Sequence, residues 1–526
     1  MRDTSKDSTN LYVEDRTQTF IDNVVIESVQ DVTRRWHTPE RRGDGPIITK
    51  DRPWEGIPTF SYSSYCVLRD PEDGLFKCWY ENSAGVPDAK LMALGLEAQQ
   101  LYAQSEDGIH WTKPELDLVQ VDGRNTNIVM PDGAHCMSVV IDPHPPRKEE
   151  RFRAFYTHMW DKNSQRQSRC AYSEDGIHWH AYDELPEMGI AGPRLCDVTI
   201  VMYDEDAREF IQNTRHILMT AAVTREVWDR SVSFARPYEP HNFAAYNQRR
   251  VWQSRSSDFI HWSEPALVAV TDDEEDNLDE SFYGMPQFRV GTVHLATVGV
   301  LRAVDNEMDV QLLVSRDGIQ WQRAIKRRPF LAPRGKGYWD AHMVSLTSPP
   351  IEVNDELWFY HGGTDYHHDW WLVGQREGID HPEARDPLGC GARFGMGLAT
   401  LRKDGYAGLF ANRYRQGVVI TRPLISLGST LIINARCAPG GSVGVEVVDR
   451  FDRVAGDCSL EHCDHFVGDS VAHTVSWNGD SRVPAGRDKG LYWRKVKFVL
   501  RDAELFSFCF ADSVEDQRQY KTEKEW

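Results

Sequence analysis

The chain has 526 residues, of which 11% are aromatic, and a formal net charge of −20. Because this length exceeds what one simple hydrophobic core holds, we expect two domains. The acidic balance argues against nucleic acids and anionic membranes as partners, and no apolar run approaches the ~20 residues of a membrane span. The chain begins with no secretory signal, and its ten cysteines form no CxxC pair. We therefore expect a cytoplasmic protein with reduced thiols.

Residues 1–46 are predicted to form an N-terminal arm. Within this arm, residues 20–26 read Phe-Ile-Asp-Asn-Val-Val-Ile, an apolar pattern that fits an extended or helical clip. We expect the clip to cross the first or the last repeat of the domain that follows.

A short phrase, Ser-x-Asp-Gly-x-x-Trp, recurs at intervals of about 60 to 90 residues, which is typical of a repeated supersecondary unit. Its copies lie at residues 105–111, 173–179, 256–262 and 315–321, with a degenerate fifth copy at residues 401–406. Between two extended runs an Asp-Gly pair predicts a hairpin turn, because Asp accepts bonds from backbone N–H groups and Gly adopts positive φ. We expect the ring after each turn, Tyr406 in the fifth copy, to pack between neighbouring sheets.

Each copy of the phrase closes the same order of elements, which is strand, turn, strand, strand, Asp-Gly turn and strand. The second strand of each unit is an apolar run, found at residues 75–80, 152–156, 209–212, 293–297 and 357–360. Five such units predict an all-β fold with a five-bladed β-propeller over residues 47–410.

Apolar alternation continues after the fifth unit, and no helix-length pattern appears. Examples are residues 430–434, 443–448 and 494–499. This pattern predicts an antiparallel β-sandwich over residues 411–526, an accessory domain for docking or oligomerisation. The sequence leaves a homo-oligomer open.

The phrase Ser-x-Asp-(aliphatic)-x-x-Trp, clearest at residues 256–262, resembles the blade signature of glycoside hydrolase families 32 and 43 and their relatives. The resemblance covers most of the chain and implies a five-bladed propeller, often followed by a β-sandwich. The whole pattern also resembles bacterial family 32-like proteins. The phrase is specific for architecture and weak for chemistry, because sialidases carry a similar turn. Family 32 opens with a Trp/Asn-Asp-Pro-Asn motif that bears the nucleophile, whereas the nearest segment here, residues 51–56, reads Asp-Arg-Pro-Trp-Glu-Gly.

The candidate catalytic residues are acids near the starts of the innermost strands, which line one mouth of a propeller funnel. Glycosidic cleavage uses two carboxyl groups, one protonated and one ionised, and crowding in a dry funnel separates their pKa values. We assign Glu280 as proton donor, Asp197 as base or nucleophile and Asp340 as a second carboxylate. Glu55 is a further contender, because the resemblance implies a first-blade nucleophile. Any one of these acids could instead be a turn or cap residue.

The candidate substrate-binding residues lie at the same level or on neighbouring loops. They are Trp54, His135, Arg215, Tyr283, Trp339, His342, His361 and Asp365. Arg215 could clamp a carboxylate or a phosphate, whereas Arg249 and Arg250 are interpreted as surface residues. Residues 360–369 hold three His and two Asp but follow a strand and contain Gly-Gly, which favours a polar rim loop over a metal site. No cofactor is expected, although a structural or active-site calcium ion is compatible with the sequence.

The leading hypothesis is a glycoside hydrolase that acts on a furanoside or a related glycoside in the propeller funnel. A glycoside phosphorylase on the same scaffold is the near alternative, and a non-catalytic propeller that binds a glycan or a protein is the second. Two carboxyl groups about 5–10 Å apart favour the enzyme. Inner-strand acids that are paired to arginines favour the binding protein.

Overall fold

The computed structural model describes most of the chain. The described residues are 11–83, 98–130, 133–158, 167–187, 198–216, 249–272, 274–277, 279–302, 305, 307–366, 368, 393–426, 428–449, 451–484 and 492–511. They form β-strands and two short 3-10 helices, Lys148–Glu150 and Ile325–Arg327, so the predicted all-β class is confirmed. No helix in these segments is long and apolar enough to cross a membrane.

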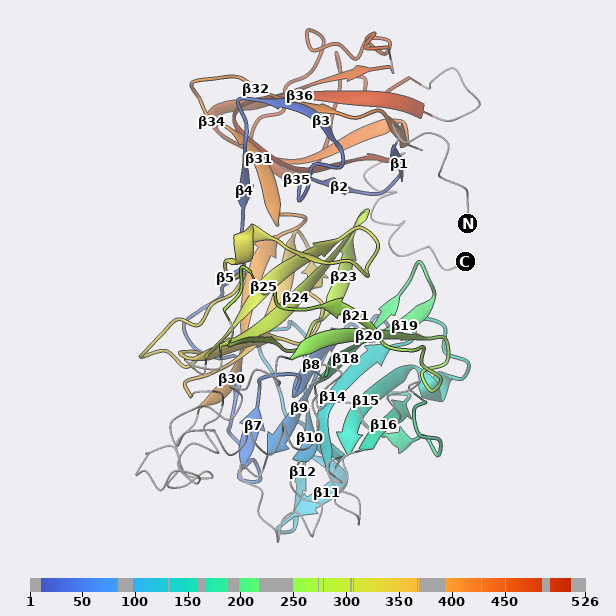
Figure 1. The fold of residues 1–526 in the computed structure, drawn as a ribbon, viewed down its shortest axis with the longest axis vertical. Helices are drawn as coiled ribbons and strands as arrows, with labels where there is room; N and C mark the ends of the chain where they lie inside the picture. Colours follow the sequence, from blue (N-terminus) through green and yellow to red (C-terminus); the bar gives the residue numbers. More distant parts are fainter. Residues whose placement is uncertain are drawn as a thin grey trace.

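Five successive β-units, here called blades 1 to 5, occupy the lower part of Figure 1. Blade 1 comprises β7 (Ile57–Thr59), β8 (Tyr65–Arg69), β9 (Phe76–Ser83), β10 (Ala98–Ser105) and β13 (Ile128–Met130). Between β10 and β13, the chain forms a separate hairpin of β11 (Leu116–Val121) and β12 (Arg124–Thr126). Blade 2 comprises β14 (Ala134–Ile141), β15 (Phe152–His158), β16 (Gln167–Ser173) and β17 (His180–Ala181). Blade 3 comprises β18 (Thr199–Asp204), β19 (Glu209–His216), β20 (Arg250–Ser256) and β21 (Ala266–Ala269).

Blades 4 and 5 are joined by a single parallel bridge between Met308 and Met343. Blade 4 comprises β22 (Glu280–Phe282), β23 (Gln287–Val290), β24 (Val293–Arg302), β25 (Glu307–Ser315) and β26 (Gln322–Arg323). Blade 5 comprises β27 (Met343–Leu346), β28 (Ile351–Val353), β29 (Glu356–Thr364) and β30 (Phe394–Arg402), and its outer edge is β5 (Glu40–Arg41) and β6 (Ile48–Thr49). Residues that precede blade 1 in the chain therefore complete blade 5.

Each blade packs apolar side chains against the next, and blade 5 packs against blade 1. The ring pairs that mark four of these contacts are Trp79 with Phe152 (5.8 Å), Phe155 with Trp262 (6.2 Å), Phe330 with Phe359 (5.5 Å) and Phe76 with Trp358 (6.0 Å). Blades 3 and 4 meet through aliphatic side chains such as Val251 and Val298. This cyclic order is that of a five-bladed propeller.

The repeated phrase forms the hairpin turn that its sequence predicts. In the second copy, Gly176 has φ +79° and donates to Ser173 Oγ over 2.9 Å, and Asp175 Oδ1 accepts from the backbone N–H of His178 over 2.9 Å. The other close copies make the same bonds, and Phe259 adopts φ +74° where the third copy lacks Gly. The turn is therefore fixed by its serine and aspartate, even where no glycine is present.

The ring that follows each turn packs against the preceding blade, as predicted. The ring pairs are Trp111 with Tyr360 (5.8 Å), Trp179 with Trp79 (6.3 Å), Trp262 with Phe155 (6.2 Å) and Tyr406 with Phe330 (6.1 Å). Tyr406 is fully buried. In the degenerate fifth copy, the Tyr406 ring therefore packs against the preceding blade in the way that a Trp ring does in the other copies.

The turn aspartates make stability depend on pH. Although burial opposes it, hydrogen bonds from His178 and His261 lower the pKa of Asp175 and Asp258 to about 2, from a usual 3.8. A depressed native pKa stabilises the fold above pH 3.8, and this contribution is lost as the pH falls toward 2. We expect Asp258→Asn to flatten the fall in unfolding free energy between pH 4 and 2, as measured by urea titration. Equal slopes in the variant and the wild type would contradict this assignment.

The N-terminal arm and the C-terminal segment form one further domain, at the top of Figure 1. Its strands are β1 (Leu11–Glu14), β2 (Gln18–Thr19), β3 (Ile26–Gln30), β4 (Thr33–Trp36), β31 (Ala407–Ala411), β32 (Gly417–Thr421), β33 (Leu424–Ser426), β34 (Thr430–Val448), β35 (Asp469–Thr474) and β36 (Tyr492–Ala511). The arm pairs with this domain through β2 on β36 and β3 on β32, and Ile21 of the predicted clip also packs into the core that blades 4 and 5 share. The arm is thus part of this accessory domain, which begins on the C-terminal side at β31.

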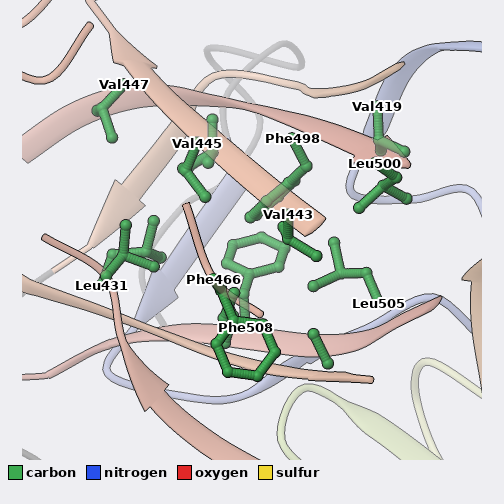
Figure 2. Close-up of a cluster of buried hydrophobic side chains, with 14 of the residues drawn as sticks. Val419, Leu431, Val443, Val445, Val447, Phe466, Phe498, Leu500, Leu505 and Phe508 are labelled. Carbon is green, nitrogen blue, oxygen red and sulfur yellow. The ribbon is translucent and has the colours of Figure 1, made fainter. Parts of the chain in front are cut away.

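The core of this domain explains why the arm pairs there. Phe20 and Val25 of the arm are buried beside Phe498 and Phe508 of β36. Figure 2 shows the aliphatic and aromatic side chains that β34 and β36 contribute. Fully burying one such side chain contributes roughly 1.5–3 kcal/mol, so the arm stabilises this core through Phe20 and Val25 and the core of blades 4 and 5 through Ile21.

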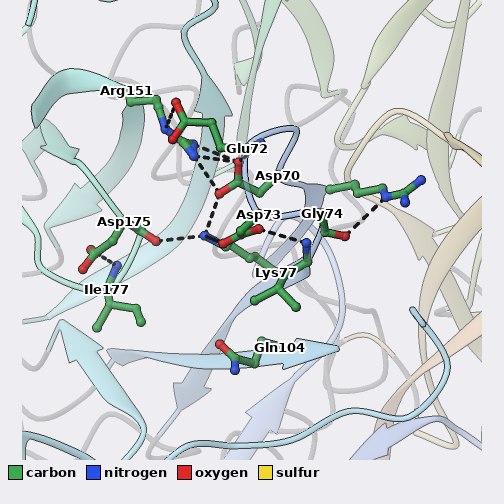
Figure 3. Close-up of polar contacts among 12 residues, drawn as sticks. Asp70, Glu72, Asp73, Gly74, Lys77, Gln104, Arg151, Asp175 and Ile177 are labelled. Carbon is green, nitrogen blue, oxygen red and sulfur yellow. Dashed lines mark hydrogen bonds and ion pairs between the residues drawn. The ribbon is translucent and has the colours of Figure 1, made fainter. Parts of the chain in front are cut away.

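A buried ion network joins blades 1 and 2 (Figure 3). Asp70 is 1% exposed, and its carboxylate lies 2.7 Å from Lys77 Nζ and 2.6 Å from Arg151 Nη2. Lys77 Nζ also donates to the backbone oxygen of Asp175, in the turn of blade 2, over 3.3 Å. One carboxylate of blade 1 is therefore the partner of two buried cations.

Candidate functional site

The innermost strands of three blades are interrupted at related positions. Residues 60–64 separate β7 from β8, residues 283–286 separate β22 from β23, and β14 shifts register between His135 and Ser138. Tyr62 and Cys136 have φ values of +56° and +50° within these interruptions. A bulge re-aims side chains, and backbone strain of this kind gathers at functional sites.

Side chains from four blades meet where these interruptions face one another. The buried cluster includes Tyr62 of blade 1, Val198 before β18, Tyr283 of blade 4 and Met343 of blade 5. Blade 2 reaches the same loop, because Cys136 Sγ lies 3.5 Å from Ser64 Oγ. We call this convergence the ring axis.

Two tyrosines and a histidine form a hydrogen-bonded group at the ring axis. Tyr283 Oη bonds to His368 Nε2, and Tyr62 Oη donates to the backbone oxygen of His368 over 3.1 Å. The Tyr62 and His368 rings meet edge-on, with centroids 5.0 Å apart. Aromatic faces with polar tips are the groups that saccharides contact through C–H faces and hydroxyls.

Two guanidinium groups lie against the Tyr283 ring. Arg215 Cζ is 4.5 Å and Arg249 Cζ 4.8 Å from the ring centroid, and both arginines are buried. The structure thus brings Arg215 and Tyr283 into contact, whereas the interpretation of Arg249 as a surface residue was wrong, because it is buried. Two cations on one ring favour an anionic group nearby.

Glu280 opens β22, three residues before Tyr283, and is 7% exposed. It shares a strand face with Phe282, which packs toward blade 3, and it lies 3.5 Å from Arg302 Nε. Arg302 also pairs with Asp309. Burial raises the pKa of both carboxyl groups, and the charge of Arg302 offsets only part of that rise. Glu280 therefore has the raised pKa that a proton donor requires.

A second polar group at the ring axis joins blades 1 and 2. His135 Nδ1 lies 2.9 Å from Glu81 Oε1, and His135 Nε2 lies 3.4 Å from Cys136 Sγ. The three residues offer ligand atoms within 4.8 Å of one another. A sulfur and an imidazole nitrogen suit zinc better than the calcium that the sequence left open.

Asp340 and Glu55 lie in closed ion-pair clusters. Asp340 is fully buried, 2.8 Å from Arg41 Nε and 2.7 Å from Arg334 Nε. The Glu55 carboxylate accepts from Tyr80 Oη over 2.7 Å and from Lys113 Nζ over 2.6 Å. The Glu55 side chain is 0% exposed, and it also accepts the backbone N–H groups of Asp51 and Arg52, as a turn residue does. Both contact sets are typical of structural carboxylates.

Two predicted substrate-binding rings make internal contacts, Trp339 as a buried residue and Trp54 as a partly buried one. Trp54 donates from Nε1 to Asn127 Oδ1 over 2.8 Å, and Trp339 stacks on His361 with ring centroids 5.4 Å apart. Burial, together with the charges of Arg41 and Arg334, lowers the pKa of His361 to about 3. This histidine is therefore a neutral core residue.

The predicted rim loop begins later than expected. His361 to Thr364 are the end of β29 rather than loop, because the glycines there allow close packing: a Cβ on Gly363 would lie 2.7 Å from Asp340 Cβ. Asp365 accepts from Arg393 Nε over 2.6 Å, and His342 Nδ1 lies 2.9 Å from Glu307 Oε1. Asp197 lies outside the described residues, directly before Val198 in the sequence.

A pocket of about 460 Å³ lies away from the ring axis, between blade 5 and the accessory domain. Arg402 crosses its wall, bonding to Asp469 over 2.6 Å and lying 4.9 Å above the Phe506 ring. His37 Nε2 lies 2.6 Å from Glu504 Oε1 in the same wall. These internal pairs hold the two domains together.

Tyr62, Glu81 and Cys136 lie at the ring axis although none of them was predicted from the sequence. The available signal was Glu81, a carboxylate that directly follows the apolar run Phe76–Tyr80 on a second strand. Tyr62 and Cys136 depend on bulges that no local pattern announces.

No family model and no curated protein matches the sequence. Similar solved structures include an N-acetylgalactosamine deacetylase from F. plautii (16% identity, 71% of this chain and 96% of that chain, TM-score 0.43) and a β-1,2-mannobiose phosphorylase from Listeria innocua (11%, 69% and 96%, TM-score 0.43). A third, described as a GH130 glycoside hydrolase targeting β-1,2-mannosidic linkages in Candida mannan, has 13% identity over 69% of this chain and 93% of that chain, with a TM-score of 0.42. The resemblance to families 32 and 43 stays a prediction, and values of this size assign no activity to this chain.

Proposed function

We propose that the chain is a glycan-active enzyme that cleaves a glycosidic bond at the mouth of the ring axis. The observation that carries the proposal is the convergence of Tyr62, Tyr283 and His368 on one point, with the acid Glu280 three residues from Tyr283. Rings that can hold a sugar, and a carboxyl group with a raised pKa nearby in the chain, are the two parts that glycosidic cleavage needs.

Glu280 is assigned as the proton donor, because burial raises its pKa. A carboxyl group with a raised pKa is suited to protonate the leaving oxygen, while a second carboxylate acts as base or nucleophile. That second role is proposed for Asp197, whose chain neighbour Val198 belongs to the ring-axis cluster. Asp340 and Glu55 are not part of this proposal, since each has strong internal partners.

Phosphorolysis is the second candidate, and the two guanidinium groups on Tyr283 favour it. Arginine recognises phosphate oxygens through its planar fork. In this variant of the mechanism, inorganic phosphate would attack the anomeric carbon in place of water. The ion pairs of Asp340, by contrast, are what the non-catalytic alternative leads us to expect.

The test is a screen of natural oligosaccharides and aryl glycosides, each with and without inorganic phosphate. We expect Glu280→Gln to lower turnover of the natural substrate by about 10²–10⁴-fold. An aryl glycoside whose leaving group needs no protonation should keep most of its turnover in that variant. Asp309→Asn is the matched control, because Asp309 shares Arg302 with Glu280 and takes no part in the chemistry.

Two results would count against the enzyme, and the phosphate dependence decides between its two mechanisms. Saccharide binding without turnover by the wild type would establish the non-catalytic alternative. Equal losses of turnover in Glu280→Gln and Asp309→Asn would show that the two carboxyl groups paired with Arg302 affect turnover only by stabilising the fold. Equal turnover with and without inorganic phosphate would exclude phosphorolysis, whereas a strict requirement for phosphate would exclude hydrolysis.

A further inference from the structure

Three reactive side chains form a chain of contacts across the boundary between blades 1 and 2. Glu81 is on β9, and His135 and Cys136 are on β14. The thiol sulfur lies 3.4 Å from one imidazole nitrogen, and the other imidazole nitrogen lies 2.9 Å from the carboxylate. This is the order of a nucleophile, a base and a group that orients the base.

The backbone is distorted to produce this order. Successive residues of a strand point to opposite faces, so His135 and Cys136 would be separated in a regular β14. The register shift between His135 and Ser138, and the left-handed φ of Cys136, bring the two side chains within contact distance. A left-handed φ at a non-glycine residue is strained and persists where the surroundings enforce it.

Glu81 stabilises this conformation through both of its carboxylate oxygens. It is buried, and while Oε1 faces the His135 ring, Oε2 accepts the backbone N–H of Cys136 over 2.9 Å. One carboxylate thus orients the imidazole and holds the strained peptide. Because a carboxylate accepts the Nδ1 proton, Nε2 is left as the basic nitrogen that faces the thiol.

We propose that Cys136 is a nucleophilic thiol that takes the acyl group of a small ester, with His135 as its base and Glu81 as a positioning residue. This activity goes beyond the cleavage of a glycosidic bond and does not involve Glu280. An O-acylated sugar is the substrate class that would also fit the ring axis.

The proposed reaction needs only the ester and water as reactants. The thiol proton passes to His135 Nε2 as sulfur bonds to the carbonyl carbon. The ester C–O bond then breaks, and the leaving alkoxide takes the proton from Nε2. Water hydrolyses the resulting thioester, releasing the carboxylic acid and restoring the thiol.

The test is acylation of the full-length protein by p-nitrophenyl acetate, since Cys136 is 2% exposed and requires a small probe. We expect p-nitrophenolate release and an acetyl group on the Cys136 peptide, measured by mass spectrometry. Cys66 is the internal control, because it is equally buried but contacts Ser348 Oγ and a backbone oxygen instead of an imidazole. His135→Asn should slow acylation of Cys136 by about 10²-fold or more.

The Glu81→Gln variant distinguishes a residue that positions His135 from one that only stabilises the fold. We expect slower acylation together with loss of the downfield proton resonance of His135 Nδ1–H, which Cys136→Ala should retain. An unlabelled Cys136, or labelling that His135→Asn leaves unchanged, would overturn the proposal. Zinc retained by the purified protein on Cys136 and His135, with acylation appearing nowhere, would make these residues metal ligands and overturn it as well.

Discussion

Replacing Asp70 by alanine is expected to lower the free energy of unfolding by about 3–5 kcal/mol. The substitution leaves Lys77 and Arg151 buried without the carboxylate that both contact (Figure 3). Their side chains are 6% and 8% exposed, so water cannot replace the lost partner. Asp73 stays 2.9 Å from Lys77 Nζ and Glu72 stays 3.1 Å from Arg151, but these two carboxylates are 41% and 58% exposed. Losing the one buried partner is therefore far more costly than losing a surface pair. Urea denaturation of the variant and the wild type measures the difference.

The matched control is Glu72→Ala. Glu72 also pairs with Arg151, at 3.1 Å, but its side chain is 58% exposed. Exposed ion pairs contribute about 0–1 kcal/mol, so this variant should unfold close to the wild type. If the two variants lost similar stability, the network would not be the buried junction between blades 1 and 2 that the structure describes.

Gly362→Ala is expected to destabilise the protein by about 3 kcal/mol or more, or to prevent folding. A Cβ at Gly362 of β29 would overlap the backbone oxygen of Phe60 and lie 2.8 Å from the Tyr65 ring. Phe60 and Tyr65 belong to blade 1, so the close approach occurs where the last blade meets the first. Backbone atoms cannot give way as a flexible side chain can. Thermal unfolding and soluble yield measure the effect.

Gly45→Ala is the control for this prediction. Gly45 has nothing within 4 Å of an added Cβ, and substitutions at such surface positions change stability by about 0.5 kcal/mol or less. A Gly362→Ala protein as stable as Gly45→Ala would mean that blades 5 and 1 are not in contact, and the propeller arrangement would fail.

The repeated turns could be predicted because their determinants are local. A serine, an aspartate and the following backbone N–H groups lie within seven residues, so the sequence alone specifies the bonds that Asp175 and Asp258 accept. The same holds for Tyr406, whose position in the repeat predicted its burial. The number of blades followed from counting these turns.

Residues whose roles depend on distant partners could not be predicted. Asp340 looked like a funnel acid, but Arg41, almost three hundred residues earlier in the chain, neutralises it. The N-terminal arm has an apolar pattern that any sheet edge could satisfy, and only the tertiary fold selects β32 and β36. Glu81 and Cys136 meet through a register shift that leaves no mark in the alternation of β14.

The most direct test of a catalytic ring axis is a crystal structure of the Glu280→Gln variant with a saccharide identified in the substrate screen. The sugar is predicted to contact Tyr62 and Tyr283, with its scissile oxygen about 2.6–3.2 Å from the residue 280 side chain. A saccharide bound only in the pocket between blade 5 and the accessory domain, with the ring axis empty, would contradict the assignment.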